Sequence, residues 1–179
     1  MDLLRPYRIY DLSPTEIKRR QRKYGNFETI NKKLIKSKSE TNFETMAKNP
    51  ELWYTYHGGL NETKKKWAYD PNEEWITKIA KTPKSRKIGD FGCGLGAIGH
   101  QFGVKRVKSF DLYSDDKEFI TACNIKSVPM KDGSVDIAIY NLSLMGKEGL
   151  AYIAKLCFQK AQYAASEISK LNHFNLKYS

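Results

Sequence analysis

The chain has 179 residues, of which 40% are hydrophobic, which suffices for one modest domain with an extension but crowds two. Its three cysteines are odd in number and lack a paired CxxC spacing, which argues against a disulfide framework and against a zinc site. No apolar run is long enough to span a bilayer, and no signal peptide opens the sequence. We therefore expect a soluble protein in a reducing, intracellular compartment, with no membrane partner.

The charge is distributed unevenly along the chain. The formal net charge is +11, and residues 1–87 carry 20 Lys or Arg against 11 Asp or Glu, whereas residues 88–179 carry 11 against 9. The first half is therefore strongly basic. Such an asymmetry favours a polyanionic partner such as RNA or DNA, and the alternative is an ordinary solvated charged surface.

The first predicted element is a helix that begins at a capping box. Ser13 can accept a hydrogen bond from an early backbone N–H, Pro14 suits the first turn, and Glu16 can reach back. The helix is expected to end at Gly25, and its apolar face is too small to bury much surface. We therefore expect a basic arm whose cations contact nucleic acid, namely Arg19, Arg20, Arg22 and Lys23.

The next stretch, around residues 32–39, is polar and weakly periodic, which favours a partly helical or mobile linker. With the first helix it forms the predicted arm, residues 1–45. Residues 46–86 are rich in aromatic side chains and are expected to form a helical cap. The cap tryptophans can stack bases or dock the helices on the core, and we favour docking. The cap also holds a cationic triplet expected to face solvent or phosphates, Lys64, Lys65 and Lys66.

After Pro83 the pattern changes to an alternation of strands and helices. This alternation predicts an α/β fold with a parallel, Rossmann-like sheet and crossover helices over residues 87–179. A short helix is expected from about Ala97. The predicted strands are Lys87–Phe91, Val107–Asp111, Phe119–Cys123 and Val135–Tyr140.

A glycine-rich turn follows the first predicted strand. Residues 89–96 read Gly-Asp-Phe-Gly-Cys-Gly-Leu-Gly, so three alternate glycines come directly after the strand. Glycine permits a positive φ and lets the backbone approach a ligand closely. Taken alone, the turn indicates either a dinucleotide site or merely a tight turn.

Two polar positions sharpen this reading. Asp111 ends the second predicted strand, twenty-one residues beyond Asp90, where a carboxylate can accept hydrogen bonds from both ribose hydroxyls. Asn124 follows the third strand and offers an acceptor for an adenine amino group, with Ile125 packed on the ring. The alternatives are a surface aspartate at a strand end and an ordinary turn asparagine.

Several of these segments together resemble the nucleolar rRNA-processing methyltransferase family, over about residues 46–146. The Leu-Ser-Leu-Met-Gly run after the fourth strand and the Tyr-His pair before the first strand are not general Rossmann features, so the combination is specific. The matching segments of the core are residues 90–94, 110–112, 123–129 and 142–146. In the cap they are residues 49–53, 56–59, 65–67 and 70–71.

The resemblance implies a class I methyltransferase that uses S-adenosylmethionine to methylate adenine N1 in large-subunit ribosomal RNA, in the nucleus or nucleolus of a eukaryote. Asn141 would orient the acceptor base, and we assign no residue a proton-transfer role. His57 has an alternative as a packing histidine. Carried over by position, the cofactor set is His57, Gly92, Asp111, Asn124, Ile125 and Asn141, with Asp90, Cys93, Gly94 and Leu112 from the same motifs.

The sequence departs from the family pattern at both ends of the predicted site. The family usually has Asp at position 124 and often Cys at position 141, and the asparagine at 124 loses the charge that strengthens an acceptor. The Lys-Pro-Gly-Gly-like turn after the fourth strand is absent, and residues 164–169 resemble the fifth strand only weakly. We therefore expect a sheet shortened at its C-terminal edge and covered by a second copy or a partner subunit.

Two other functions compete with an active methyltransferase. The first is a non-catalytic, nucleic-acid-binding subunit of a methyltransferase complex, which the shortened C-terminal part and Asn124 favour. The intact glycine turn, Asp111 and His57 oppose it. The second is a nicotinamide-dependent oxidoreductase, whose spacing fits less well.

Overall fold

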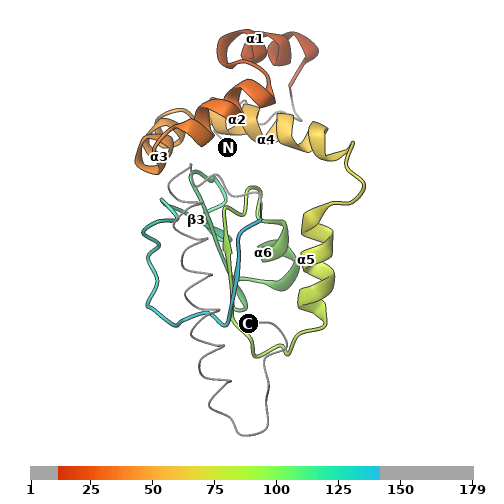
Figure 1. The fold of residues 1–179 in the computed structure, drawn as a ribbon, viewed down its shortest axis with the longest axis vertical. Helices are drawn as coiled ribbons and strands as arrows, with labels where there is room; N and C mark the ends of the chain where they lie inside the picture. The colour runs from red at the N-terminus through yellow and green to blue at the C-terminus, as the bar shows by residue number, and fades with distance from the viewer. Residues whose placement is uncertain (1–11, 142–179) are drawn as a thin grey trace, which may run out of the picture.

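The computed structural model describes residues 12–141 of the chain, and this part forms a layer of helices above a small parallel sheet (Figure 1). The helices that come first in the chain are α1 (Pro14–Tyr24), α2 (Phe27–Lys36), α3 (Ser39–Lys48), α4 (Pro50–Lys64) and α5 (Pro71–Ala80). The sheet end holds β1 (Ile88–Phe91), α6 (Ala97–Phe102), β2 (Val107–Asp111), β3 (Ile120–Ala122) and β4 (Ile137–Ile139).

The four strands confirm the predicted parallel sheet, in the order β3-β2-β1-β4. Ile88 of β1 lies opposite Val107 on one side and Ile137 on the other, and Ser109 of β2 lies opposite Ile120. Only the β1–β2 connection carries a crossover helix, α6, so the prediction of regular alternation was wrong for the other two connections. Those segments are rich in Asp, Ser, Gly and Pro, which favour turns over helix.

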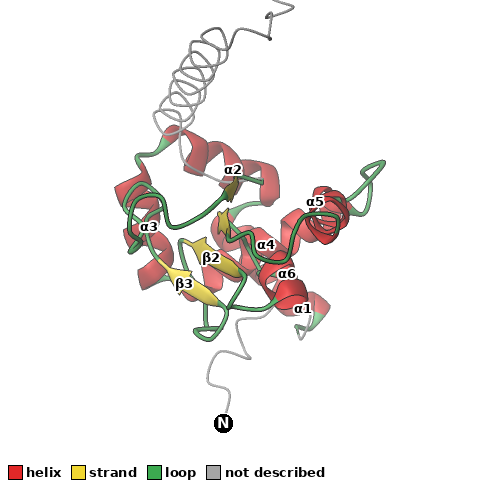
Figure 2. Cartoon of the chain, turned by 90° about the horizontal axis from the view of Figure 1, so that it is seen from below, coloured by secondary structure: helices red, strands yellow, loops and turns green. Residues whose placement is uncertain are grey.

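The two faces of the sheet are covered differently. Ile88, Val107 and Ile139 pack with Ile79 of α5 and Ile98 of α6. Figure 2 shows these two helices on the same side of the strands. Because successive strand residues point to opposite faces, Phe91 and Phe110 lie on the other face, against Cys123 and three side chains of the loop after β3, Ile125, Val128 and Met130.

The helix α1 begins and ends where the capping box and the glycine predict. Ser13 Oγ accepts from Glu16 N at 3.3 Å, and Gly25 follows the last turn with a φ of +95°. The Glu16 carboxylate does not reach back to the cap, because it binds Arg19 at 2.6 Å and Arg20 at 3.0 Å instead. That part of the capping-box expectation was wrong.

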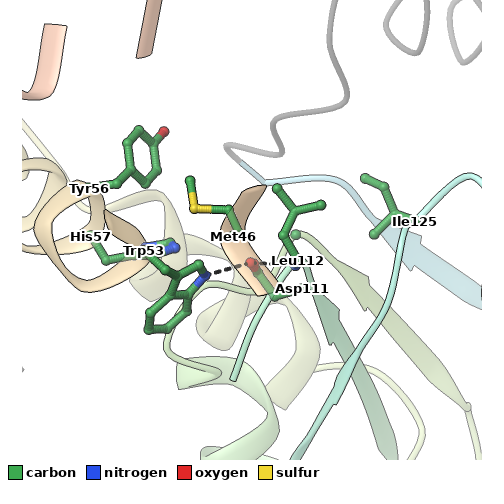
Figure 3. Close-up of a pocket in the computed structure, with 8 residues that line it drawn as sticks. Met46, Trp53, Tyr56, His57, Asp111, Leu112 and Ile125 are labelled. Carbon is green, nitrogen blue, oxygen red and sulfur yellow. Dashed lines mark hydrogen bonds between the residues drawn. The ribbon is translucent and has the colours of Figure 1, made fainter. Parts of the chain in front are cut away.

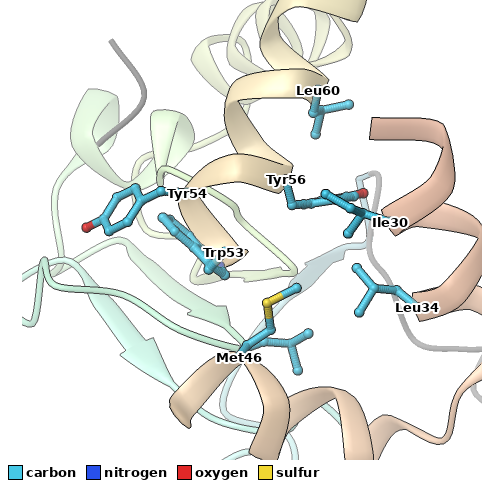
Figure 4. Packing of buried hydrophobic residues seen from close by; sticks show 8 residues of the cluster. Ile30, Leu34, Met46, Trp53, Tyr54, Tyr56 and Leu60 are labelled. Atoms are coloured by element: carbon cyan, nitrogen blue, oxygen red, sulfur yellow. The ribbon is translucent and has the colours of Figure 1, made fainter. Parts of the chain in front are cut away.

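The stretch expected to be a linker forms two ordered helices, α2 and α3. Asn26 caps α2 by accepting from Thr29 N at 3.0 Å, and Ile30 and Leu34 fall on one buried face of the helix. These two side chains pack with Met46 of α3 and Trp53 of α4 (Figure 4). The periodicity was weak because only a narrow stripe of α2 is apolar, yet that stripe suffices once α4 covers it.

The same cluster joins the helices to the sheet. Leu112, directly after β2, is 8% exposed and belongs to the apolar cluster formed by α2, α3 and α4. Tyr113 packs against the same cluster. The cap therefore sits over the carboxyl end of β2. Among residues 12–141, no helix combines the length and apolar character needed to cross a membrane.

Candidate functional site

The glycine turn between β1 and α6 adopts the backbone conformation that its sequence predicts. Gly92, Gly94 and Gly96 have φ values of +78°, +59° and +73°. At Gly94 the close approach is to the cap, because a Cβ built there would lie 3.1 Å from Cε1 of His57. A side chain at this position would therefore be strained by its φ and would push against the His57 ring.

Asp111 lies at the centre of the site and is only 6% exposed. Its Oδ1 accepts from Trp53 Nε1 at 3.1 Å (Figure 3) and from Leu112 N at 2.8 Å. Its Oδ2 accepts from Gly94 N at 2.7 Å. The alternative of a surface aspartate is therefore wrong. Since each carboxylate oxygen can accept two hydrogen bonds, Oδ2 keeps capacity for a ligand hydroxyl.

Asp90, directly before the turn, is 2% exposed, and its Oδ1 has no hydrogen-bond partner within residues 12–141. Burial, assisted by the negative charge of Asp111, raises the pKa of Asp90 to about 7. The carboxyl is therefore partly protonated at neutral pH and largely protonated at lower pH. An unmet buried acceptor of this kind is typical of a binding site that a ligand completes.

His57 projects from α4 between the turn and the cap aromatics. Its ring centroid lies 4.2 Å from that of Trp53 and 5.1 Å from that of Tyr56. Burial lowers the pKa of His57, the charge of Asp111 acts in the opposite direction, and Lys64 lowers it further. The imidazole is therefore neutral at physiological pH, which suits packing and hydrogen bonding better than ion pairing.

Two cavities lie on either side of His57 and Gly92, which line both. The first, of about 30 Å³, is also lined by Met46, Trp53, Tyr56, Asp111, Leu112 and Ile125 (Figure 3). The second, of about 230 Å³, is also lined by Leu60, Asn61, Lys64, Asp70, Asn72, Cys93, Gly94, Leu95, Ala97 and Asn141. The wall of the first is mostly apolar, whereas the wall of the second combines polar and apolar groups.

The structure brings most of the expected cofactor residues to these cavities, but not all of them. Asn124 lines neither cavity, because its amide is bound elsewhere. Its Nδ2 lies 3.0 Å and its Oδ1 3.1 Å from the Ser39 hydroxyl, and Oδ1 also accepts from Lys126 N at 3.1 Å. Asp90 lines neither, although it precedes the turn. Asn141 reaches the second cavity, where its Nδ2 donates to Asn72 Oδ1 at 2.6 Å.

The sequence did not predict that polar side chains of α4 and α5 would line the second cavity. Lys64, expected to contact phosphates, has a side chain only 12% exposed and pairs with Asp70 at 2.8 Å. Asp70 also caps α5 by accepting from Asn72 N at 2.9 Å. The Asp-Pro-Asn run of residues 70–72 is a helix-start signal, so it pointed to α5 but not to the cavity that α5 helps to line.

The expectation that all four cations of α1 contact a nucleic acid is wrong for Arg20. Arg20 is 1% exposed and pairs with Glu16 at 3.0 Å and with Glu51 of α4 at 3.8 Å, so it cannot contact a partner. Arg19 and Lys23 are exposed but also bind Glu51, at 2.5 and 3.2 Å. The helix is thus fastened to the cap by an ion-pair cluster. Lys65 pairs with Glu62 at 2.6 Å, whereas Arg22 and Lys66 are exposed.

The described residues gather no set of metal ligands. Within residues 12–141, no three His, Cys, Asp or Glu side chains come together around a point that could hold an ion. Burial holds the pKa of the Cys93 thiol well above its usual range, assisted by Asp111 and Asp90. Cys93 is therefore a thiol rather than a reactive thiolate.

Comparison with known proteins points to one group. Residues 13–157 match the model of a family described as hypothetical methyltransferase. The chain is 36% identical over 124 residues to ribosomal RNA-processing protein 8 of Drosophila melanogaster, covering 69% of this chain and 34% of that protein. It is 34% identical over 140 residues to the 25S rRNA (adenine(645)-N(1))-methyltransferase of Schizosaccharomyces pombe, covering 72% and 44%. The chain thus spans less than half the length of these relatives.

Proposed function

The chain belongs to the methyltransferase family that its sequence matches over residues 13–157, and we propose that it binds S-adenosylmethionine and methylates RNA. The observation that carries this proposal is that the glycine turn contacts both Asp111, at the end of β2, and His57 of α4. In open parallel sheets, ligands bind beyond the carboxyl ends of the strands, which is where these residues lie.

The residues around the two cavities fit the cofactor in chemical kind. The Asp111 carboxylate suits ribose hydroxyls, and the apolar walls formed by Met46, Leu112 and Ile125 suit an adenine ring. A cavity of about 30 Å³ has room for about one water, so these walls must move apart to admit a nucleoside. When bound, S-adenosylmethionine supplies an electrophilic methyl group on its sulfonium.

The acceptor proposed for the methyl group is N1 of an adenine in large-subunit ribosomal RNA. The name of the Schizosaccharomyces pombe relative supports this choice. Adenine N1 already presents a lone pair, so the protein needs to hold the base in line rather than to remove a proton. Asn141 is proposed to orient the base, since Asn72 holds its amide nitrogen at 2.6 Å and leaves its Oδ1 as an acceptor. A base in structured RNA has to be flipped out to reach this site.

We also propose a surface for the RNA backbone. Four exposed lysines, from the loops before β1 and β2, from β2 and from the loop before β4, line one groove of about 440 Å³. Among the described residues, no acidic side chain lines this groove. Excess positive charge without a counter-ion attracts phosphates, whereas most of the α1 cations already have protein partners. The four are Lys87, Lys105, Lys108 and Lys131.

Nuclear or nucleolar location in a eukaryote, and a second chain at the sheet edge, belong to the same proposal. β4 is an edge strand of the sheet formed by the described residues, and such an edge invites pairing with another chain. The weakly matching segment 164–169 lies outside the described residues. A mass measurement in solution that returns a monomer at high concentration would count against a second copy.

A non-catalytic RNA-binding subunit is the second candidate. The small first cavity and the three protein donors already on Asp111 favour it. Calorimetry with S-adenosylmethionine is the first test, because absence of binding would favour the non-catalytic candidate. Binding at micromolar concentrations favours the enzyme.

Activity is tested by incubating the protein with methyl-labelled S-adenosylmethionine and total RNA, followed by nucleoside analysis. We expect label in 1-methyladenosine from large-subunit ribosomal RNA. Label in another nucleoside would overturn the proposed acceptor but not the enzyme class. Cofactor binding with no labelled nucleoside would favour the non-catalytic candidate.

A further inference from the structure

An ion pair between α4 and α5 lines the second cavity. Lys64, the last residue of α4, places its Nζ 2.8 Å from Oδ2 of Asp70, at the start of α5. Both side chains line the cavity of about 230 Å³, together with the glycine turn. The pair therefore lies beside the element that is expected to approach the cofactor.

Lys64 differs from its neighbours in how far it is withdrawn from water. Its side chain is 12% exposed, whereas that of Lys65 is 69% exposed and pairs with Glu62, which is equally exposed. Withdrawing an ammonium group from water is costly unless it is paired and hydrogen-bonded. Asp70 supplies one partner, but an ammonium group has three donors.

The other described residues of the cavity wall are uncharged. Asn61, Asn72 and Asn141 are amides, burial keeps His57 neutral by lowering its pKa, and the Cys93 thiol stays protonated because burial raises its pKa. The cavity thus presents one fixed positive and one fixed negative group side by side, among neutral polar groups. This arrangement is complementary to a zwitterion, in which a carboxylate and an ammonium lie on one carbon atom.

We propose that Lys64 and Asp70 bind the amino-acid end of S-adenosylmethionine, Lys64 taking its α-carboxylate and Asp70 its α-ammonium. This inference rests on the proposed use of that cofactor. The two cavities share His57 and Gly92, so a ligand with its ribose on Asp111 extends past these residues toward Lys64. Lys64 thereby becomes a cofactor-binding residue rather than a phosphate contact.

Two product-like ligands isolate this contact in calorimetry. S-adenosylhomocysteine carries the amino-acid group, and 5′-methylthioadenosine lacks it but keeps the adenosine and the sulfur. The wild-type protein is expected to bind S-adenosylhomocysteine more tightly. Lys64→Met should weaken S-adenosylhomocysteine binding at least about tenfold, which corresponds to about 1.4 kcal/mol, and leave 5′-methylthioadenosine unchanged.

Matched variants distinguish recognition from a structural effect. Lys64→Arg keeps the charge and should retain most of the preference, while Lys65→Met should change neither affinity. Asp70→Asn should weaken S-adenosylhomocysteine but not its deaminated analogue.

Three other outcomes would contradict either the inference or the proposed function. Equal weakening of both ligands by Lys64→Met would assign Lys64 a purely structural role and overturn the inference. Unchanged binding of both would overturn it as well. A wild-type protein that binds neither ligand would instead overturn the proposed function on which the inference rests.

Discussion

Trp53 Nε1 donates a hydrogen bond to Asp111 Oδ1 at 3.1 Å, and this bond joins the cap to the acid that ends β2. Both residues are buried, at 1% and 6% exposure. Asp111 also accepts from Gly94 N, so one carboxylate links α4, β2 and the glycine turn. The position of the cap and the orientation of the acid are therefore coupled.

We predict that replacing each partner of this bond has a different effect on cofactor binding. Asp111→Asn places an amide N–H2 where one carboxylate oxygen accepted, so Gly94 N or Trp53 Nε1 is left without its acceptor, at a cost of about 1–3 kcal/mol. It also removes the charge that is proposed to bind the ribose hydroxyls, and binding of S-adenosylmethionine should be abolished. Trp53→Phe removes the Nε1 donor and part of a buried ring, and should cost about 2–3 kcal/mol of stability with little change in binding.

Calorimetry gives the affinities, and urea unfolding followed by circular dichroism gives the free energies of unfolding. Tight binding by a folded Asp111→Asn variant would show that the ribose is not held by this acid. Failure of a folded Trp53→Phe variant to bind would show that the indole itself orients Asp111.

A second prediction concerns the contact between Gly94 and His57. Gly94→Ala forces a side chain into a positive φ and brings its Cβ to 3.1 Å from the imidazole. The backbone strain costs about 1–2 kcal/mol, and the displaced ring and turn should weaken cofactor binding more than tenfold. Gly133→Ala is the matched control, because Gly133 has a φ of +70° and open space around it. It should be destabilised to a similar extent and keep full affinity; equal affinities for the two variants would remove the turn from the binding site.

The sheet and the turn were predictable from sequence because they depend on local pattern. The run from Lys87 to Phe91 is short and is followed directly by the glycine-rich turn, and the structure has β1 at Ile88–Phe91. The spacing from Asp90 to Asp111 likewise follows from the length of one strand–helix–strand unit. Such features need only the few residues around each position.

The polar wall and the fate of the basic residues depend on long-range packing, which no local pattern contains. Arg20 and Lys64 are both members of cationic runs in the sequence, yet both side chains are largely buried. Arg20 lies near Glu51, far along the chain, and Lys64 pairs with Asp70, beyond a turn. Arg20 faces two carboxylates, and only Glu16, one turn away on α1, is local, whereas Glu51 lies on another helix. Nothing near Asn124 announced that Ser39 would bind its amide.

A third prediction follows from the buried carboxyl of Asp90. Its pKa is about 7 in the folded protein against 3.8 in the unfolded chain. Between these values the folded state holds a proton that the unfolded state has released, so this group makes stability fall as pH rises through the window. The effect amounts to about 1.4 kcal/mol per pKa unit.

Urea unfolding of the wild-type protein and of Asp90→Asn at several pH values between 4 and about 8 measures this contribution. The stability of Asp90→Asn relative to the wild type should increase with pH, because the amide does not ionise. A difference that stays constant across the window would show that Asp90 is charged throughout. Cofactor binding to the wild type, but not to Asp90→Asn, should also be accompanied by uptake or release of protons. Calorimetry in buffers of different ionisation enthalpy measures this.

The last prediction tests which basic surface meets RNA. Replacing the four groove lysines, Lys87, Lys105, Lys108 and Lys131, with glutamine should weaken RNA binding. The dependence of the logarithm of the affinity on that of salt concentration should flatten by roughly 0.7 for each phosphate of single-stranded RNA that the variant no longer neutralises. Filter binding or fluorescence anisotropy across a salt series measures both.

A matched quadruple variant separates this effect from the change in net charge. Lys32, Lys33, Lys36 and Lys38 are likewise exposed and lie in α2 and directly before α3, so glutamines there remove the same charge from the helical layer. This variant should bind RNA with a nearly unchanged salt slope, since release of bound counter-ions requires direct phosphate contact. A flatter slope in the variant of the helical layer, with an unchanged slope in the groove variant, would show that RNA binds to the helices and not in the groove.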